Sequence, residues 1–181
     1  MPGRSWLANA VTGLRVVCIP VFVLLAQTAA GHGAAYGWIA GLVFAVAAAS
    51  DVIDGRLARR AGTASNGGRF FDHFADIGFI LGALACYVHL GLAPWWVPAS
   101  IALSFAFYLV DSLRRTARAP SLIGSRLGHL GGIANYVLIG VLVFNHSAAI
   151  ELLPAWFMTL LFALVPIYSF GAILSRRVSA A

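Results

Sequence analysis

The chain of 181 residues is 61% hydrophobic and 10% charged, with a formal net charge of +6. Soluble globular domains carry about 25% charged residues, so this composition excludes that class and indicates a polytopic membrane protein. All the basic residues are arginines, and they stand beside or between long apolar runs rather than on a solvated basic face, which argues against nucleic-acid binding.

Six apolar runs are long enough to cross a hydrocarbon core about 30 Å thick, which takes about 20 helical residues. They cover residues 9–28, 35–57, 69–90, 95–115, 130–147 and 153–174. We therefore expect an all-α integral membrane protein with six transmembrane helices, in which residues 1–181 form a single domain. The first run also has features of a signal peptide, because Arg4 precedes it and small residues follow it, but Arg15 inside the run argues against that interpretation.

The arginines predict the orientation of these spans. They lie at the start of the first run, between the second and third, between the fourth and fifth, and after the sixth, whereas the other three connections contain none. Because cytoplasmic loops are enriched in arginine, we expect a multi-pass protein of the cell membrane with both termini in the cytoplasm. Tryptophans gather near the arginine-free connections, as an outer aromatic belt would: Trp38, Trp95, Trp96 and Trp156.

Four of the six acidic residues gather between the second and third runs, at Asp51, Asp54, Asp72 and Asp76. Charged groups near a bilayer are costly, so such a cluster is a functional-site hypothesis. If both flanks are helical, each pair shares one helix face, because the members are three or four residues apart. Carboxylates suit Mg²⁺ or Mn²⁺, so four of them predict a site for two such ions beside a phosphate ester, with one carboxylate taking a proton from a hydroxyl nucleophile.

The spacing around these aspartates resembles the signature of the class I CDP-alcohol phosphotransferases. It reads Asp51-x-x-Asp54-Gly55-x-x-Ala58-Arg59, then eight residues, then Gly68-x-x-x-Asp72-x-x-x-Asp76. The resemblance implies a membrane enzyme of six transmembrane helices that transfers a phosphatidyl group from CDP-diacylglycerol to a small polar alcohol and releases CMP. Beyond Asp76 the resemblance rests on the number of helices alone.

The resemblance also implies roles for individual residues. The four aspartates would ligate two divalent ions, and Asp76 would in addition be the general base toward the acceptor hydroxyl. Small and basic residues would line the site for the CDP group: Gly55, Ala58, Arg59, Ser65 and Gly68. The segment Asn9-x-x-Thr12-x-x-Arg15 is similar to the start of the first helix in the branch that makes phosphatidylglycerophosphate, and it would either touch the nucleotide or cap and anchor its helix. Members commonly form homodimers through their transmembrane helices.

The acceptor is predicted from weaker signals. Four arginines on the expected cytoplasmic side would bind the phosphate of an acceptor such as glycerol 3-phosphate, or anionic lipid head groups: Arg114, Arg115, Arg118 and Arg126. His73 and Ile77 stand where the phosphatidylglycerophosphate and cardiolipin branches usually carry proline and lysine, so inositol phosphate, serine and phosphatidylglycerol stay open as acceptors.

Two further residues and one further class of function stay open. His73 would either support a metal ligand or the acceptor or have no direct role, and Asp111 is most simply explained by an ion pair with Arg114 or Arg115. Intramembrane carboxylates also line cation pathways, but the outer halves of the spans are almost wholly apolar, which argues against a transporter.

Overall fold

The computed structural model describes the backbone of residues 5–61, 66–116, 126–147 and 153–178, and the side chains of residues 12–50, 71–112, 130–145 and 153–175. Within these ranges the chain forms six helices and no strand. The helices are α1 (Ser5–His32), α2 (Ala34–Ala61), α3 (Asn66–His89), α4 (Trp96–Thr116), α5 (Arg126–Ser147) and α6 (Ala155–Val178). The predicted all-α fold is confirmed for this part of the chain.

The surface of the bundle is that of a membrane protein. Among the described residues, three helical segments are long and apolar enough to cross a membrane: Thr12–His32, Phe71–His89 and Ala155–Ser175. The other three helices contribute shorter apolar segments: Ala34–Ser50, Trp96–Ser112 and Leu130–Asn145. Large apolar side chains face outward, with Leu42 65% and Ile167 66% exposed. Water would not tolerate so extensive an apolar surface, whereas lipid matches it, so the chain is a multi-pass membrane protein.

The helices around the aspartates are longer than the predicted spans. Helix α2 continues to Ala61, past residue 57 where the second span was expected to end, and α3 begins at Asn66, before residue 69. Both pairs of aspartates therefore lie on helical backbone, as the spacing argument requires. Ser65 falls between the two helices, outside the described residues.

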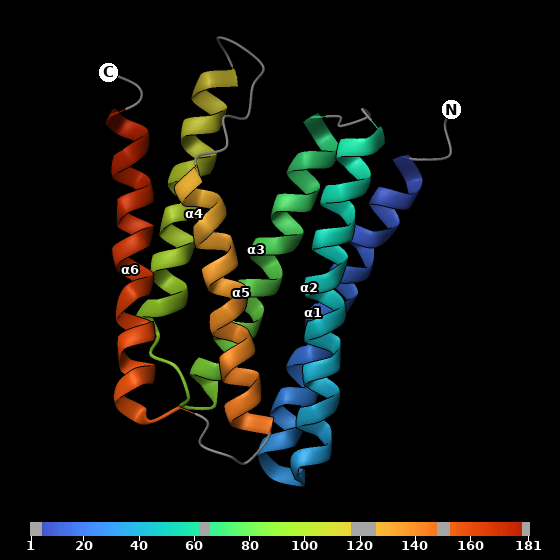
Figure 1. Ribbon diagram of the computed structural model, residues 1–181, viewed down its shortest axis with the longest axis vertical. Coiled ribbons are helices and arrows are strands. Elements are labelled where there is room, and N and C mark those ends of the chain that lie inside the picture. The colour runs from blue at the N-terminus through green and yellow to red at the C-terminus, as the bar shows by residue number, and fades with distance from the viewer. Residues whose placement is uncertain (1–4, 62–65, 117–125, 148–152, 179–181) are drawn as a thin grey trace.

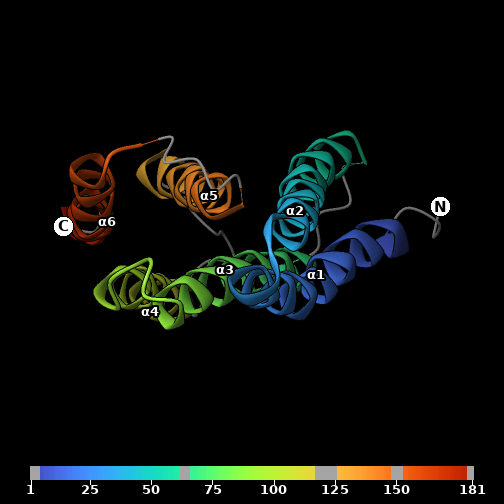
Figure 2. The same cartoon turned by 90° about the horizontal axis from the view of Figure 1, so that it is seen from below.

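The helices lie in two layers (Figure 2). Helices α4, α3 and α1 form one row and α6, α5 and α2 form the other, with contacts across the layers between α1 and α2, α3 and α5, and α4 and α6. Successive helices run in opposite directions (Figure 1). The first turns of α1, α3 and α5 therefore share one end of the bundle with the last turns of α2, α4 and α6, and this end carries the aspartates.

A tight turn ends α3 at the opposite end of the bundle. After α3, the Leu92 N–H donates to the Tyr87 carbonyl (2.8 Å) and the Gly91 N–H donates to the Val88 carbonyl (3.0 Å), which is a Schellman motif. Gly91 has a φ of 72°, a conformation that glycine adopts without steric cost. This turn lets α4 reverse direction immediately beside α3.

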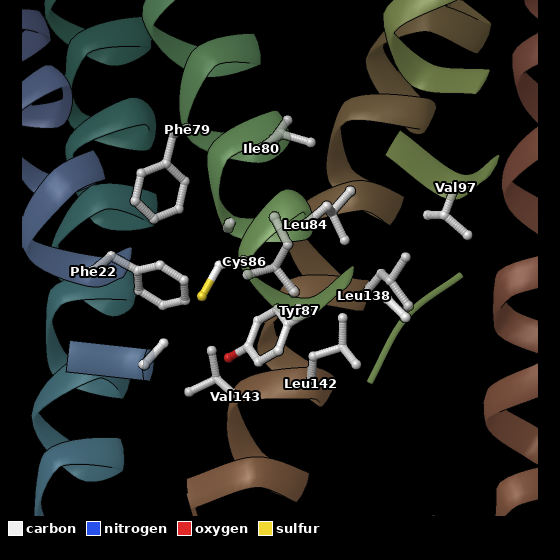
Figure 3. Packing of buried hydrophobic residues seen from close by; sticks show 14 of the residues in the cluster. Phe22, Phe79, Ile80, Leu84, Cys86, Tyr87, Val97, Leu138, Leu142 and Val143 are labelled. Carbon is white, nitrogen blue, oxygen red and sulfur yellow. The ribbon is translucent and has the colours of Figure 1, made fainter. Parts of the chain in front are cut away.

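The core holds α1, α3 and α5 together (Figure 3). Phe22 of α1 and Phe79 of α3 are both 0% exposed, and their ring centroids are 5.6 Å apart. Tyr87 of α3 lies edge-on to Phe22 at 6.2 Å, and α5 adds Leu138 and Leu142 from the other side. Because these side chains are buried and interlocked, α3 is fixed relative to both of its neighbours.

Helices α1 and α3 approach each other at two glycines. A Cβ added to Gly82 would lie 2.9 Å from Ile19 Cγ2, and one added to Gly78 would lie 3.4 Å from Ile19 Cδ1. Small residues allow helices in a membrane to come this close. Ile19 is one turn beyond Arg15 on α1, so the contact also sets how near Arg15 comes to α3.

Replacing the glycine at the closest point should push the two helices apart. Gly82→Ala places a methyl group inside contact distance of Ile19, and overpacking of this kind costs about 1–3 kcal/mol. We expect a lower midpoint of thermal unfolding in detergent. Gly171→Ala is the control, because its Cβ would meet nothing within 4 Å. In an Ile19→Ala background Gly82→Ala should cost much less, and an equal cost in both backgrounds would contradict the proposed contact.

Candidate active site

The carboxylates of α3 meet an arginine from α1. Nη1 of Arg15 donates to Oδ1 of Asp72 at 3.1 Å and also to Oδ1 of Asp76. Asp72 and Asp76 are one helical turn apart, so their side chains leave the same face of α3. The two carboxylate oxygens thus converge on a single cationic nitrogen.

Burial differs sharply between the two sides of this ion pair. The Arg15 side chain is 0% exposed, whereas those of Asp76 and Asp72 are 21% and 35% exposed. A buried guanidinium without a counter-ion would cost several kcal/mol, so Arg15 depends on these carboxylates. The aspartates keep exposed surface, through which a ligand can reach them.

Helix α5 supplies a second contact to Asp76. The Tyr136 hydroxyl donates to Asp76 Oδ1 at 3.4 Å, and the Tyr136 ring stacks on Phe79 with centroids 6.2 Å apart and an interplanar angle of 9°. The preceding residue, Asn135, is buried and accepts a hydrogen bond from the Tyr168 hydroxyl of α6. Tyr136 is therefore held in place by its neighbours, and it helps to orient the Asp76 carboxylate.

Three further sequence-predicted residues have described side chains, one each on α1, α3 and α4. Thr12 is buried one turn before Arg15, on the same side of α1. His73 is exposed and its ring lies 5.5 Å from that of Tyr108 on α4, so it packs toward α4. Asp111 is half-buried near the end of α4.

Most other predicted site residues lie outside the described side chains. For one group only the helical backbone is described: Asn9, Asp51, Asp54, Gly55, Ala58, Arg59, Gly68, Arg114, Arg115 and Arg126. Ser65 and Arg118 lie outside the described residues altogether. Among the described side chains no group of three or more acidic, histidine or cysteine residues gathers at one point. The predicted four-aspartate metal site includes two residues beyond that set, so it stays a prediction.

The donor set that is described fits a hard cation. Two carboxylate oxygens, Oδ1 of Asp72 and Oδ1 of Asp76, already point at one positive charge. Mg²⁺ and Mn²⁺ prefer such oxygen ligands. The geometry of this half of the site is therefore compatible with the predicted ions.

Two contacts of the site, those of Arg15 and of Tyr136 with the aspartates of α3, were not predicted from the sequence. Arg15 was grouped with a segment that touches the nucleotide or anchors its helix, and its pairing with Asp72 and Asp76 was not predicted. A signal was present, because an arginine inside an apolar run needs an anionic partner. Tyr136 carried no such signal, since its position beside Asp76 depends on how α5 packs against α3.

Comparison with known proteins adds independent information. The chain is 43% identical over 95 residues to a probable phosphatidylglycerophosphate synthase of Mycobacterium tuberculosis (strain CDC 1551 / Oshkosh), covering 52% of this chain and 46% of that protein. It is 28% identical over 158 residues to the CDP-diacylglycerol–glycerol-3-phosphate 3-phosphatidyltransferase of Bacillus subtilis (strain 168), covering 81% and 80%. It is 31% identical over 134 residues to a cardiolipin synthase (CMP-forming) of Streptomyces coelicolor (strain ATCC BAA-471 / A3(2) / M145), covering 72% and 60%.

These matches differ in extent. The chain spans about half the length of the mycobacterial relative that it matches, at 46%. The profile of the CDP-alcohol phosphatidyltransferase family, in contrast, matches residues 5–167, which include α1 with Arg15 and both pairs of aspartates. The chain therefore belongs to the CDP-alcohol phosphatidyltransferase family.

Proposed function

We propose that the protein transfers a phosphatidyl group from CDP-diacylglycerol to an alcohol and releases CMP. Family membership supports the reaction type. The structural observation that carries the proposal is the convergence of Asp72 and Asp76 on one cationic atom, Arg15 Nη1. A metal-assisted reaction of a diphosphate requires a site that attracts positive charge. These two carboxylates form such a site, at the end of the bundle where α2 also ends.

In the proposed reaction the acceptor hydroxyl oxygen attacks the phosphorus atom that carries the diacylglycerol group. A new P–O bond forms, and the bond from that phosphorus to the oxygen of CMP breaks, so that CMP leaves with the bonding electron pair. The hydroxyl proton passes to the carboxylate of Asp76, which acts as general base. Arg15 and Tyr136 both donate to Oδ1 of Asp76, so this carboxylate is held in one orientation.

Asp51, Asp54, Asp72 and Asp76 would hold two Mg²⁺ or Mn²⁺ ions. When bound, such ions would supply positive charge that stabilises the negative charge on the leaving CMP. The CDP group would lie against the small and basic residues of the signature, with two residues of α1 nearby: Gly55, Ala58, Arg59, Ser65, Gly68, Asn9 and Thr12. Burial of Thr12 one turn from Arg15 supports a place for that part of α1 beside the site.

For the acceptor we propose glycerol 3-phosphate. The mycobacterial and Bacillus relatives are named as enzymes of phosphatidylglycerophosphate synthesis, which supports this choice. The Streptomyces relative is named a cardiolipin synthase, so phosphatidylglycerol is the first alternative. Arg114, Arg115, Arg118 and Arg126 would bind the phosphate of the acceptor, because arginine matches phosphate geometry through two parallel hydrogen bonds.

We propose six transmembrane spans with both termini and the aspartates facing the cytoplasm. The antiparallel order of the helices is consistent with this topology, because arginines stand in the last turns of α2, α4 and α6 and in the first turns of α3 and α5, and these turns lie at the same end of the bundle (Figure 1). The acyl chains of the donor would then lie in the bilayer while CDP and the acceptor stay at the inner surface. The resemblance also implies a homodimer, whose mass in detergent would be about twice the 19.1 kDa of one chain.

The direct test of the reaction is release of CMP by the purified protein. We expect CMP from CDP-diacylglycerol in the presence of Mg²⁺ or Mn²⁺ with glycerol 3-phosphate, and much less with inositol phosphate, serine or phosphatidylglycerol. A preference for one of the other alcohols would replace the proposed acceptor but keep the reaction. Ion flux in liposomes without CMP from any acceptor would instead favour a transporter.

Loss of the proposed base should stop turnover. Asp76→Asn removes both the proton acceptor and a metal ligand, and we expect CMP release to fall by a factor of about 10³ or more, since each role alone contributes about 10²-fold or more. Asp111→Asn, a change in an aspartate of α4, is the control, and turnover is compared at saturating acceptor because Asp111 stands beside the proposed acceptor-binding residues Arg114 and Arg115. A variant Asp76→Asn with more than about a tenth of wild-type turnover would show that the proton goes elsewhere.

Arg59 is expected to act on the donor. Arg59→Ala should raise the apparent KM for CDP-diacylglycerol by about tenfold, because a charge-assisted hydrogen bond to phosphate contributes roughly 1.5–3 kcal/mol. The KM for glycerol 3-phosphate should stay close to that of the wild type. An unchanged KM for CDP-diacylglycerol would return Arg59 to a role in membrane topology.

A further inference from the structure

We infer that Arg15 is a built-in counter-ion that competes with the divalent metal for Asp72 and Asp76. The inference rests on the proposed metal site. It adds that the site already contains a cation of its own, which metal must displace from the two carboxylates before it can bind them.

The competition follows from which atoms are shared. A single nitrogen, Nη1 of Arg15, contacts Oδ1 of both aspartates. The guanidinium therefore occupies the point on which these two oxygens converge. A metal ion that uses the same oxygens as ligands needs that position, so the two cations cannot both hold it.

The competing charge is permanent and unscreened. A guanidinium stays protonated at every pH at which a protein is folded, so the competing charge of Arg15 is not lost by deprotonation. The Arg15 side chain is 0% exposed, so salt in solution reaches it poorly. Arg15 also cannot retreat by a shift of α1, because Ile19 is seated against Gly78 and Gly82 one turn further along. Metal binding therefore requires the Arg15 side chain itself to change conformation.

The same contacts determine the relative free energies of the metal-free and the metal-bound protein. Without metal, Arg15 balances two carboxylates that would otherwise repel each other across one helical turn. With metal bound, those carboxylates are balanced by the ion, and the buried guanidinium loses its partners there. Arg15 therefore stabilises the metal-free protein more than the metal-bound protein. The difference between these two stabilisation free energies is the amount by which Arg15 weakens metal binding.

An arriving anion would relieve this cost. In the proposed reaction the diphosphate of a CDP-alcohol binds at this site, so it would bring negative charge that can replace the carboxylates as a partner of Arg15. Metal and nucleotide should therefore bind cooperatively. The metal would bind weakly alone and tightly together with the nucleotide.

The test is the affinity for Mn²⁺ of the full chain in detergent, measured from the electron paramagnetic resonance signal of free Mn²⁺. Arg15→Gln keeps a hydrogen-bonding side chain without the charge, and we expect it to bind Mn²⁺ about tenfold more tightly than the wild type, within the usual range of coupling between two sites. Added CDP should raise the Mn²⁺ affinity of the wild type more than that of Arg15→Gln. Cys18→Ala, a change in a buried neighbour on the same helix, is the control and should leave the affinity unchanged.

Thermal unfolding supplies a readout that does not depend on binding assays. In EDTA the midpoint of Arg15→Gln should lie below that of the wild type, and saturating Mn²⁺ should raise it by more than it raises the wild type. Arg15→Lys keeps the charge but concentrates it on one nitrogen, so its unfolding midpoint in EDTA should lie between those of Arg15→Gln and the wild type. It is the variant to use if Arg15→Gln does not fold.

The outcomes separate this inference from the proposed function. If the wild type binds Mn²⁺ and Arg15→Gln or Arg15→Lys binds it equally or less tightly, Arg15 positions the ligands and does not compete, and the inference is overturned while the metal site stands. If no variant binds Mn²⁺, the metal site itself fails and the inference fails with it.

Discussion

A permanently charged arginine in the middle of an apolar helix is the constraint on which this structure depends. Arg15 lies within α1, fully buried, and among the described residues it forms ion pairs with Asp72 and Asp76. Because an unpaired guanidinium in such surroundings is so costly, α1 has to dock against the start of α3. Gly78 and Gly82 then allow the two helices to approach closely enough for the pair to form.

An aromatic layer separates this polar end from the apolar core. Phe44 of α2, Phe79 of α3 and Tyr136 of α5 lie with ring centroids between 6.2 and 6.3 Å apart. Tyr136 turns its hydroxyl toward Asp76 and its ring toward Phe79, so one side chain belongs to both regions. The change from charged to apolar surroundings takes less than one turn of α3, because Asp76 is 21% exposed and Phe79 is 0% exposed.

This arrangement suits the function that we propose. A donor with two acyl chains and a water-soluble nucleotide has to react where bilayer and water meet. A charged site next to an apolar core suits a position at that interface. The fixed orientation of Asp76 would favour proton transfer, because a base that is already aligned loses little entropy in the transition state. The built-in cation would keep the cluster of carboxylates stable until metal and substrate arrive together.

The sequence alone predicted much of this protein from composition and spacing. Six apolar runs were enough to predict a six-helix fold, because a span must satisfy its backbone internally and only a helix does so within one segment. The spacing of Asp51, Asp54, Asp72 and Asp76 predicted that each pair shares one helix face, because its members are three or four residues apart. The same spacing carried the resemblance to the family, which the match over residues 5–167 confirms. The tertiary structure decided which groups from distant helices meet. That Arg15 contacts Asp72 and Asp76, and that Tyr136 reaches Asp76, depends on the packing of α1 and α5 against α3, and local spacing carries no information about how separate helices pack.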